Sequence, residues 1–99
     1  MSYEMMVGLQ VKNDAEYTRY REAMSPILKQ YGGGFRYDFK VSEILKNDEG
    51  RPINRVFAIY FEDKNKMDEF FRNSDYLEAK SEFFDVSVEA TTIISEYER

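Results

Sequence analysis

Three consecutive glycines, Gly32–Gly34, set the organisation of the first half of the chain. Glycine tolerates positive φ and lets the backbone reverse tightly, so a glycine run ends a helix that reaches it. The residues before it, 13–31, have the apolar spacing of an amphipathic helix, and residues 35–45 after it alternate as a strand does. We therefore expect a strand, a helix, a sharp reversal and a second strand in this half.

The expected helix has a recognisable start and one apolar face. Asn13 and Glu16 have the spacing of a capping box, which favours a first turn at this point. Pro26 interrupts the segment, because proline donates no backbone hydrogen bond and crowds the preceding turn. The apolar stripe keeps its phase across Pro26, which favours one kinked, continuous helix over a second segment capped by Ser25. The stripe consists of Tyr17, Tyr20, Met24, Ile27, Leu28 and Tyr31.

Several segments have the apolar alternation or the β-branched residues of strands. Gly8, inside the first of them, indicates a bulge or the close approach of a neighbouring chain. In the second, the alternation slips near residues 42–43, which indicates a bulge there, and a polar loop follows at residues 46–52. The strands are predicted at residues 3–11, 35–45, 55–61 and 86–97.

The strand at residues 55–61 is apolar on both faces, as expected of a central strand that is covered on both sides. A second helix is predicted after Asp63, which can cap it. Residues 72–75 break this helix, and a further helical segment follows with Ser74 or Asp75 as its cap. The apolar residues of the two helical segments are Met67, Phe70, Phe71, Tyr76, Leu77, Phe83 and Phe84.

Composition excludes several classes of function. The net charge of −5 argues against binding to a nucleic-acid backbone. With no cysteine and no histidine, the commonest metal ligands, the usual haem ligand and the commonest general base are missing. We expect no metal and no cofactor, and no catalytic residue can be named. No signal peptide and no membrane-spanning run is visible, so a cytoplasmic protein is expected.

The order of elements, β-α-β-β-α-β, predicts an α+β fold of the ferredoxin-like type, formed as a single domain by residues 1–99. Its helices cover one face of a four-stranded antiparallel sheet, and nothing remains in the chain to cover the other. If this face were left bare, the exposed apolar patch would be larger than soluble monomers usually tolerate. Two-fold homodimers are the commonest solution, so we expect a homodimer.

A set of residues spread over the chain resembles the dimeric α+β barrel superfamily, and within it the uncharacterised bacterial family known as domain of unknown function 1330. The residues that support this resemblance, in order, are Tyr17, Tyr20, Pro26, Tyr31-Gly32-Gly33, Arg55, Phe61, Asp63 and the run from Phe71 to Tyr76. The resemblance implies a homodimer whose sheets form a barrel, with a pocket between sheet and helices in each protomer. It implies no particular reaction.

The chain departs from this family in two places. Relatives often have Glu near the end of the third strand and Arg late in the second helix, and Tyr60 and Phe83 stand there instead. If that pair forms a charged feature in relatives, this chain has aromatic surface in its place. An anionic ligand is then less favoured.

The candidate ligand-binding residues are five tyrosines and one arginine. Arg55 opens the apolar third strand, where a cation needs a partner, so it either clamps a ligand anion or pairs with a nearby carboxylate. The tyrosine hydroxyls either reach into a pocket or are satisfied within the core. The tyrosines are Tyr17, Tyr20, Tyr37, Tyr60 and Tyr76.

Two hypotheses for the function follow. The first is a homodimeric module that binds a small molecule in an aromatic-lined pocket. The alternative is a cofactor-independent enzyme, monooxygenase-like or isomerase-like, that acts on a small aromatic or polyketide-like substrate which tyrosine hydroxyls and Arg55 orient.

Overall fold

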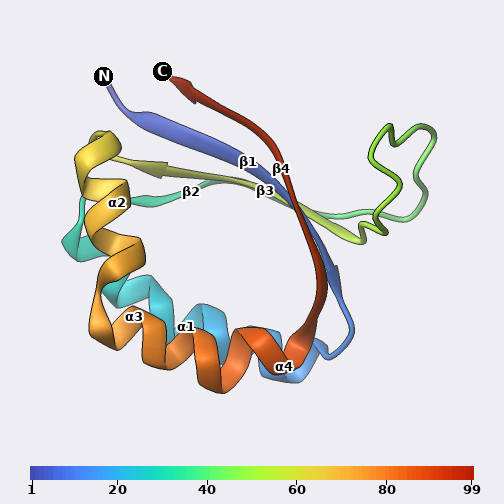
Figure 1. Ribbon diagram of the computed structural model, residues 1–99, viewed down its shortest axis with the longest axis horizontal. Helices are drawn as coiled ribbons and strands as arrows, with labels where there is room; N and C mark the ends of the chain where they lie inside the picture. The colour runs from blue at the N-terminus through green and yellow to red at the C-terminus, as the bar shows by residue number, and fades with distance from the viewer.

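A computed structural model describes residues 1–99 and contains one antiparallel sheet with helices on one of its faces (Figure 1). The strands bend over the helices, so that sheet and helices together enclose the middle of the molecule. The elements in order are β1 (Tyr3–Val11), α1 (Asp14–Gln30), β2 (Gly34–Lys40), β3 (Arg55–Phe61), α2 (Lys64–Arg72), α3 (Ser74–Ala79), the π turn η1 (Lys80–Phe84), α4 (Asp85–Ser87) and β4 (Val88–Glu98).

The strand order is β2-β3-β1-β4, and every neighbouring pair is antiparallel. This confirms the predicted ferredoxin-like α+β fold. In the centre of the sheet Met5 lies opposite Ile59 and Val7 lies opposite Phe57, which places all four side chains on the helix side. The termini lie side by side, because the backbone amides of Ser2 and Arg99 each donate to the carbonyl of the other.

The three glycines have separate roles at the end of α1. Gly32 adopts a φ of 70°, and the amides of Gly32 and Gly33 donate to the carbonyls of Lys29 and Leu28, the pattern of a Schellman cap. A Cβ on Gly33 would lie 2.5 Å from the Leu28 side chain, and one on Gly34 would lie 2.6 Å from the Tyr60 hydroxyl. Gly32 is therefore required for the positive φ of the turn, and Gly33 and Gly34 are required because neighbouring side chains pack closely against them.

The predicted helix starts were right for α1 and α2. Asn13 accepts from the amide of Glu16, and Asp63 accepts from the amide of Lys66. α1 is continuous through Pro26, as predicted. The cap of α3 was assigned wrongly, because Asn73 rather than Ser74 or Asp75 has the extended backbone from which a side chain can reach the amide of Tyr76.

β2 and β4 also differ from the prediction. β2 ends at Lys40 instead of residue 45, because the last backbone hydrogen bond to this neighbour is the one that Val41 donates to Asn54, after which the chain forms the loop of residues 41–54. Its irregularity lies between Phe35 and Tyr37 rather than at residues 42–43. β4 begins at Val88 instead of residue 86, since α4 extends to Ser87.

The sheet face opposite the helices, called the outer face below, is apolar in part. Ile53 covers Gly8 there: its side chain would lie 2.8 Å from a Cβ on that glycine, so the close neighbour is the chain's own. Tyr37, Phe39 and Ile94 remain 47%, 54% and 48% exposed. The loop of residues 41–54 extends beyond the body of the molecule at this side (Figure 1).

Candidate functional site: an aromatic cavity with an arginine pair

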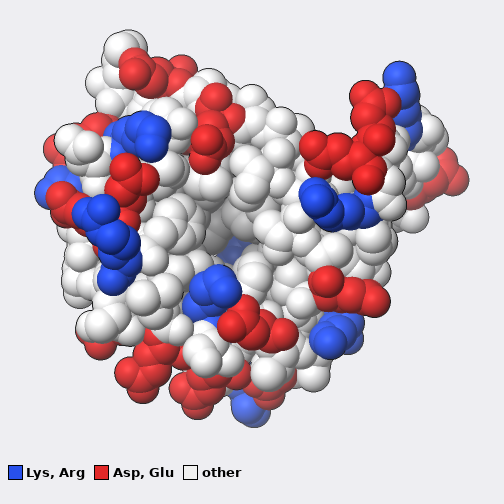
Figure 2. Space-filling model, in the orientation of Figure 1, with Lys and Arg blue, Asp and Glu red and all other residues white.

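A cavity of about 400 Å³ lies between the sheet and the helices, and Figure 2 shows the hollow in the middle of the molecule with basic atoms visible in its depth. Of its 17 lining residues, 14 are hydrophobic. Apolar, concave sites of this size with a few polar groups are the usual form of a small-molecule site. The lining comes from β1, α1, β2, β3, α2, α3, η1 and β4 and consists of Met5, Val7, Leu9, Tyr17, Tyr20, Arg21, Met24, Phe35, Phe57, Ile59, Phe71, Tyr76, Leu77, Lys80, Phe84, Thr91 and Ile93.

The two periodicities of the sequence explain why these residues converge. Alternate residues of β1 face the helices, and one stripe of α1 faces the sheet. The π turn η1 begins at Lys80 and ends at Phe84, and both of these residues line the cavity. Single π turns occur frequently at functional sites. Leu77 and Ile93 are 47% and 46% exposed, so they stand where the cavity meets solvent.

Two phenols form a polar pair in the cavity wall. The hydroxyls of Tyr20 and Tyr76 share a buried hydrogen bond of 3.0 Å. Burial is the main reason that the pKa of Tyr20 and the pKa of Tyr76 both lie above the ordinary value for tyrosine. Both groups therefore stay protonated at neutral pH and cannot act as phenolate bases. Because one hydroxyl donates to the other, the pair has one O–H left to donate to a ligand.

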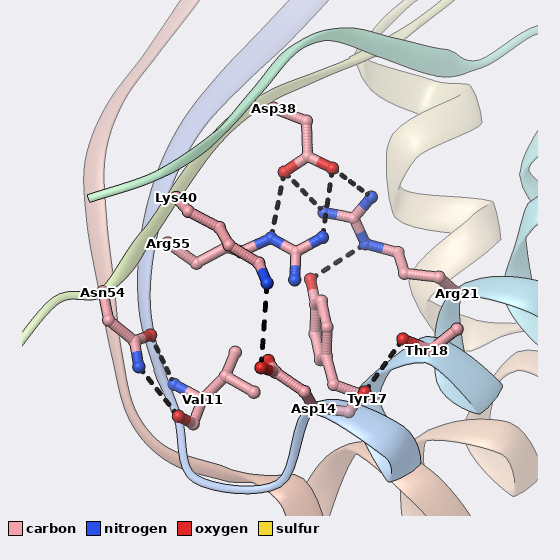
Figure 3. A network of polar contacts seen from close by, with 9 residues as sticks. All are labelled: Val11, Asp14, Tyr17, Thr18, Arg21, Asp38, Lys40, Asn54 and Arg55. Carbon is pink, nitrogen blue, oxygen red and sulfur yellow. Dashed lines mark hydrogen bonds and ion pairs between the residues drawn. The ribbon is translucent and has the colours of Figure 1, made fainter. Parts of the chain in front are cut away.

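At one side of the cavity two arginines share one carboxylate (Figure 3). Arg21, from α1, donates to Asp38 at 3.0 and 3.3 Å, and Arg55, from β3, donates to Asp38 twice at 3.3 Å. The Nε of Arg21 also donates to the Tyr17 hydroxyl at 2.9 Å. Helix α1 and strands β2 and β3 are thus tied together at this point.

This cluster is partly buried: the side chains of Arg21 and Arg55 are 15% and 18% exposed. Burial by itself would raise the pKa of Asp38, but hydrogen bonds from Arg55 and the charge of Arg21 outweigh it and hold that pKa below the usual range. Burial also raises the pKa of Tyr17, although the charge of Arg21 opposes this. Asp38 is therefore ionised at neutral pH and Tyr17 is not.

The guanidinium of Arg21 also lies close to aromatic rings. Its central carbon lies 3.8 Å from the ring centroid of Phe35 and 4.9 Å from that of Phe57. Stacking on ring faces holds a guanidinium by cation–π attraction and limits its movement. Arg21 is accordingly fixed by its contacts before any ligand arrives.

The structure separates the six predicted candidates into three groups. Tyr17, Tyr20 and Tyr76 line the cavity. Arg55 pairs with Asp38 beside the cavity, the second of the two alternatives left open for it. The last two candidates lie on the outer face, where Tyr37 stacks on Phe39 and Tyr60 lies under the Arg36 guanidinium.

Sequence reasoning missed Arg21 and Lys80, the two charged residues that line the cavity. The available signal was position: Arg21 is one turn after Tyr17 on the helix stripe. Tyr60 and Phe83, the two departures from the family pattern, are not among the lining residues, so they do not set the charge inside the cavity.

The side chains form no group of three or more acidic residues that could hold a metal ion. None of the helices has the length and hydropathy that crossing a bilayer requires.

Comparison with known proteins gives a family and a fold but no activity. A family model described as "Domain of unknown function (DUF1330)" matches residues 3–97. No curated protein matches the sequence.

Solved structures with the same fold come from several bacteria. A protein of unknown function from Rhodopseudomonas palustris superposes with a TM-score of 0.84 at 16% identity, covering 99% of this chain and 82% of that one. A dimeric ferredoxin-like protein of unknown function from Jannaschia has a TM-score of 0.61 at 14% identity, with 100% of both chains covered. A putative antibiotic biosynthesis monooxygenase from Nitrosomonas europaea has a TM-score of 0.55 at 18% identity, covering 97% of this chain and 88% of that one.

Proposed function

We propose that this chain, which belongs to the DUF1330 family of unknown function, is a homodimeric protein that binds a small molecule in its cavity. The molecule has an aromatic or other apolar body. The observation that supports this most strongly is the cavity of about 400 Å³ between sheet and helices. A concave apolar wall of this size gains free energy when an apolar molecule covers it and removes it from water. The half-exposed Leu77 and Ile93 mark where such a molecule can enter.

The polar groups of the cavity suit recognition of such a molecule. Tyr20 and Tyr76 offer hydroxyls on an otherwise apolar wall, and Thr91 offers another from β4. A few fixed polar groups among apolar ones give a ligand its orientation.

The homodimer is supported by the outer face. Tyr37, Phe39 and Ile94 leave large apolar side chains half exposed there. The Thr92 hydroxyl on the same face is buried without a hydrogen-bond partner. A second copy packed on this face would cover the apolar groups, and dimeric relatives with this fold, such as the Jannaschia protein, make this arrangement reasonable.

Binding is tested by isothermal titration with 2-naphthamide, a neutral bicyclic aromatic probe. We expect saturable binding to the wild-type protein and an affinity lower by about tenfold or more in Leu77→Trp, which places a bulky indole ring at the mouth of the cavity. Val86→Trp is the matched control, because Val86 is 51% exposed but does not line the cavity. No binding to the wild type, or equal loss in both variants, would count against the proposal.

The enzyme hypothesis ranks second. Its support is the putative monooxygenase from Nitrosomonas europaea, which shares this fold only. The candidate acid-base groups in the cavity are phenols with a raised pKa, which favours hydrogen bonding over proton abstraction. Turnover of a bound aromatic compound, followed by mass spectrometry, would reverse this ranking.

A further inference from the structure

The cavity contains charge of one sign only. Arg21 and Lys80 are its charged lining residues, and no carboxylate lines it. This is notable in a chain with 19 acidic and 14 basic residues. The net charge of the whole chain is therefore negative, whereas the charge that lines its cavity is positive.

The positive charge beside the cavity is also incompletely neutralised by the protein. Arg21 and Arg55 share Asp38 as their acceptor, so two cations meet one anion. Asp14 is the next carboxylate, but it pairs with Lys40 at 3.8 Å and both side chains are at least 69% exposed (Figure 3). Together the five groups have one unit of positive charge in excess.

Lys80, on η1, has a partner of its own. Its Nζ lies 2.9 Å from Asp85, and the side chains are 41% and 52% exposed, so this pair is solvated and neutral overall. The uncompensated charge accordingly belongs to the cluster around Arg21. A partly buried cation without full compensation is costly unless an anion binds beside it.

Arg21 has hydrogen-bond donors to spare for such an anion. A guanidinium has five N–H groups. Three of those on Arg21 donate, one to Tyr17 and two to Asp38, which leaves one on each terminal nitrogen. The two terminal nitrogens use their parallel N–H groups on Asp38, so the two that remain point to opposite edges of the guanidinium. Either of them can donate one charge-assisted hydrogen bond to a ligand carboxylate.

We propose that the ligand of this cavity is an aromatic or alicyclic monocarboxylate whose acid group pairs with Arg21. This inference rests on the proposed function and specifies the class of ligand. One unit of excess charge fits a monoanion, and the apolar lining disfavours a strongly hydrated dianion such as a phosphate monoester. The ring system of the ligand lies against Phe35, Phe57 and the apolar residues of β1.

The experiment compares 2-naphthoate with 2-naphthamide, which have the same ring and nearly the same shape but differ in charge. In the wild-type protein at neutral pH we expect naphthoate to bind about tenfold tighter or more, the usual worth of a charge-assisted hydrogen bond. In Arg21→Met this preference should disappear, because the side chain keeps an unbranched apolar stem but loses its charge and donors.

Arg19→Met is the matched control. It removes the same charge from the same helix, but Arg19 is 64% exposed and pairs only with Glu16, so the preference for naphthoate should survive. Amide binding by Arg21→Met serves as the internal check that the cavity is still formed.

The outcomes separate the two proposals. Equal affinity of the wild type for acid and amide, or an unchanged preference in Arg21→Met, overturns the inference and leaves the binding role standing. Binding of neither compound overturns both. Loss of amide binding in Arg21→Met shows that the variant has lost its cavity, and Arg21→Lys is then measured: a retained preference for the acid supports the charge assignment, and equal binding refutes it.

Discussion

The guanidinium carbon of Arg21 lies 3.8 Å from the ring centroid of Phe35. Arg21 lies in the middle of α1, and Phe35 follows directly after the glycine reversal, at the start of β2. The reversal therefore brings a cation and an aromatic ring together, and Asp38 on the same strand supplies the opposite charge. One local turn thus builds both the core packing and the charged side of the cavity.

The first prediction concerns Asp38, which accepts hydrogen bonds from two guanidiniums. Asp38→Asn leaves Arg21 and Arg55 facing each other without their shared anion, and we expect a loss of about 1–3 kcal/mol in the free energy of unfolding. Asp14→Asn is the control, because its exposed pair with Lys40 is worth about 0–1 kcal/mol. Urea denaturation measures both, and equal effects would contradict the role assigned to Asp38.

The second prediction concerns acid. The folded-state pKa of Asp38 lies below its ordinary value, because the two arginines outweigh the effect of burial. The pKa of Glu4 is lowered in the same way: burial opposes the shift, and hydrogen bonds from Tyr97 and Arg36 outweigh it. A group whose folded pKa is lowered contributes stability that is complete above its unfolded pKa and is lost as pH falls through the folded one.

We therefore expect the free energy of unfolding to fall as pH decreases below about 5, since unfolded Asp and Glu titrate near 3.9 and 4.3. Asp38→Asn should flatten this dependence, because it removes the carboxyl whose folded-state pKa is lowered. Denaturation curves at a series of pH values test this. A wild-type protein equally stable across that range would argue against both lowered pKa values.

The third prediction concerns the phenol pair. Tyr20→Phe and Tyr76→Phe each leave one buried hydroxyl without its partner, so each should cost about 1–3 kcal/mol. The double variant removes both hydroxyls and should cost less than the sum. A double-mutant cycle by chemical denaturation gives the coupling energy. Strict additivity would mean that the two hydroxyls do not depend on each other.

The fourth prediction separates the two faces of β4. Ile93 lines the cavity and Ile94 lies on the outer face, and the two neighbours are 46% and 48% exposed. If a second copy covers the outer face, Ile94→Lys should shift the protein to monomers because it buries a charge in the interface. Ile93→Lys should remain dimeric. Analytical ultracentrifugation measures the oligomeric state of each variant. If both variants were dimeric, or both monomeric, the assignment of Ile93 and Ile94 to opposite faces would be contradicted.

Much of the fold could be predicted because its signals are local. Capping by Asn13 and Asp63 depends on residues three positions away, and alternation along β1 and β3 depends on the strand alone. The end of β2 could not be predicted in the same way, because Lys40 is the last residue that finds a partner on another strand. Asn73 was missed because several capping residues stand together there.

The candidate site was predictable only in part, for a similar reason. The apolar stripe of α1 identified Tyr17 and Tyr20, since a helix face can be read from spacing. The function of Arg21 depends on Asp38 and Arg55, which lie 17 and 34 positions further along the chain. Its position one turn after Tyr17 was a signal, but charged residues on a helix are ordinarily solvated, so that signal alone did not single it out.

The most direct measurement is native mass spectrometry of the protein purified from its own host. The proposed role predicts a dimer mass that retains a small, non-covalently bound acidic molecule, which is released on denaturation and has a stoichiometry of one per protomer. A monomer without any bound molecule would contradict both the covered outer face and the occupied cavity.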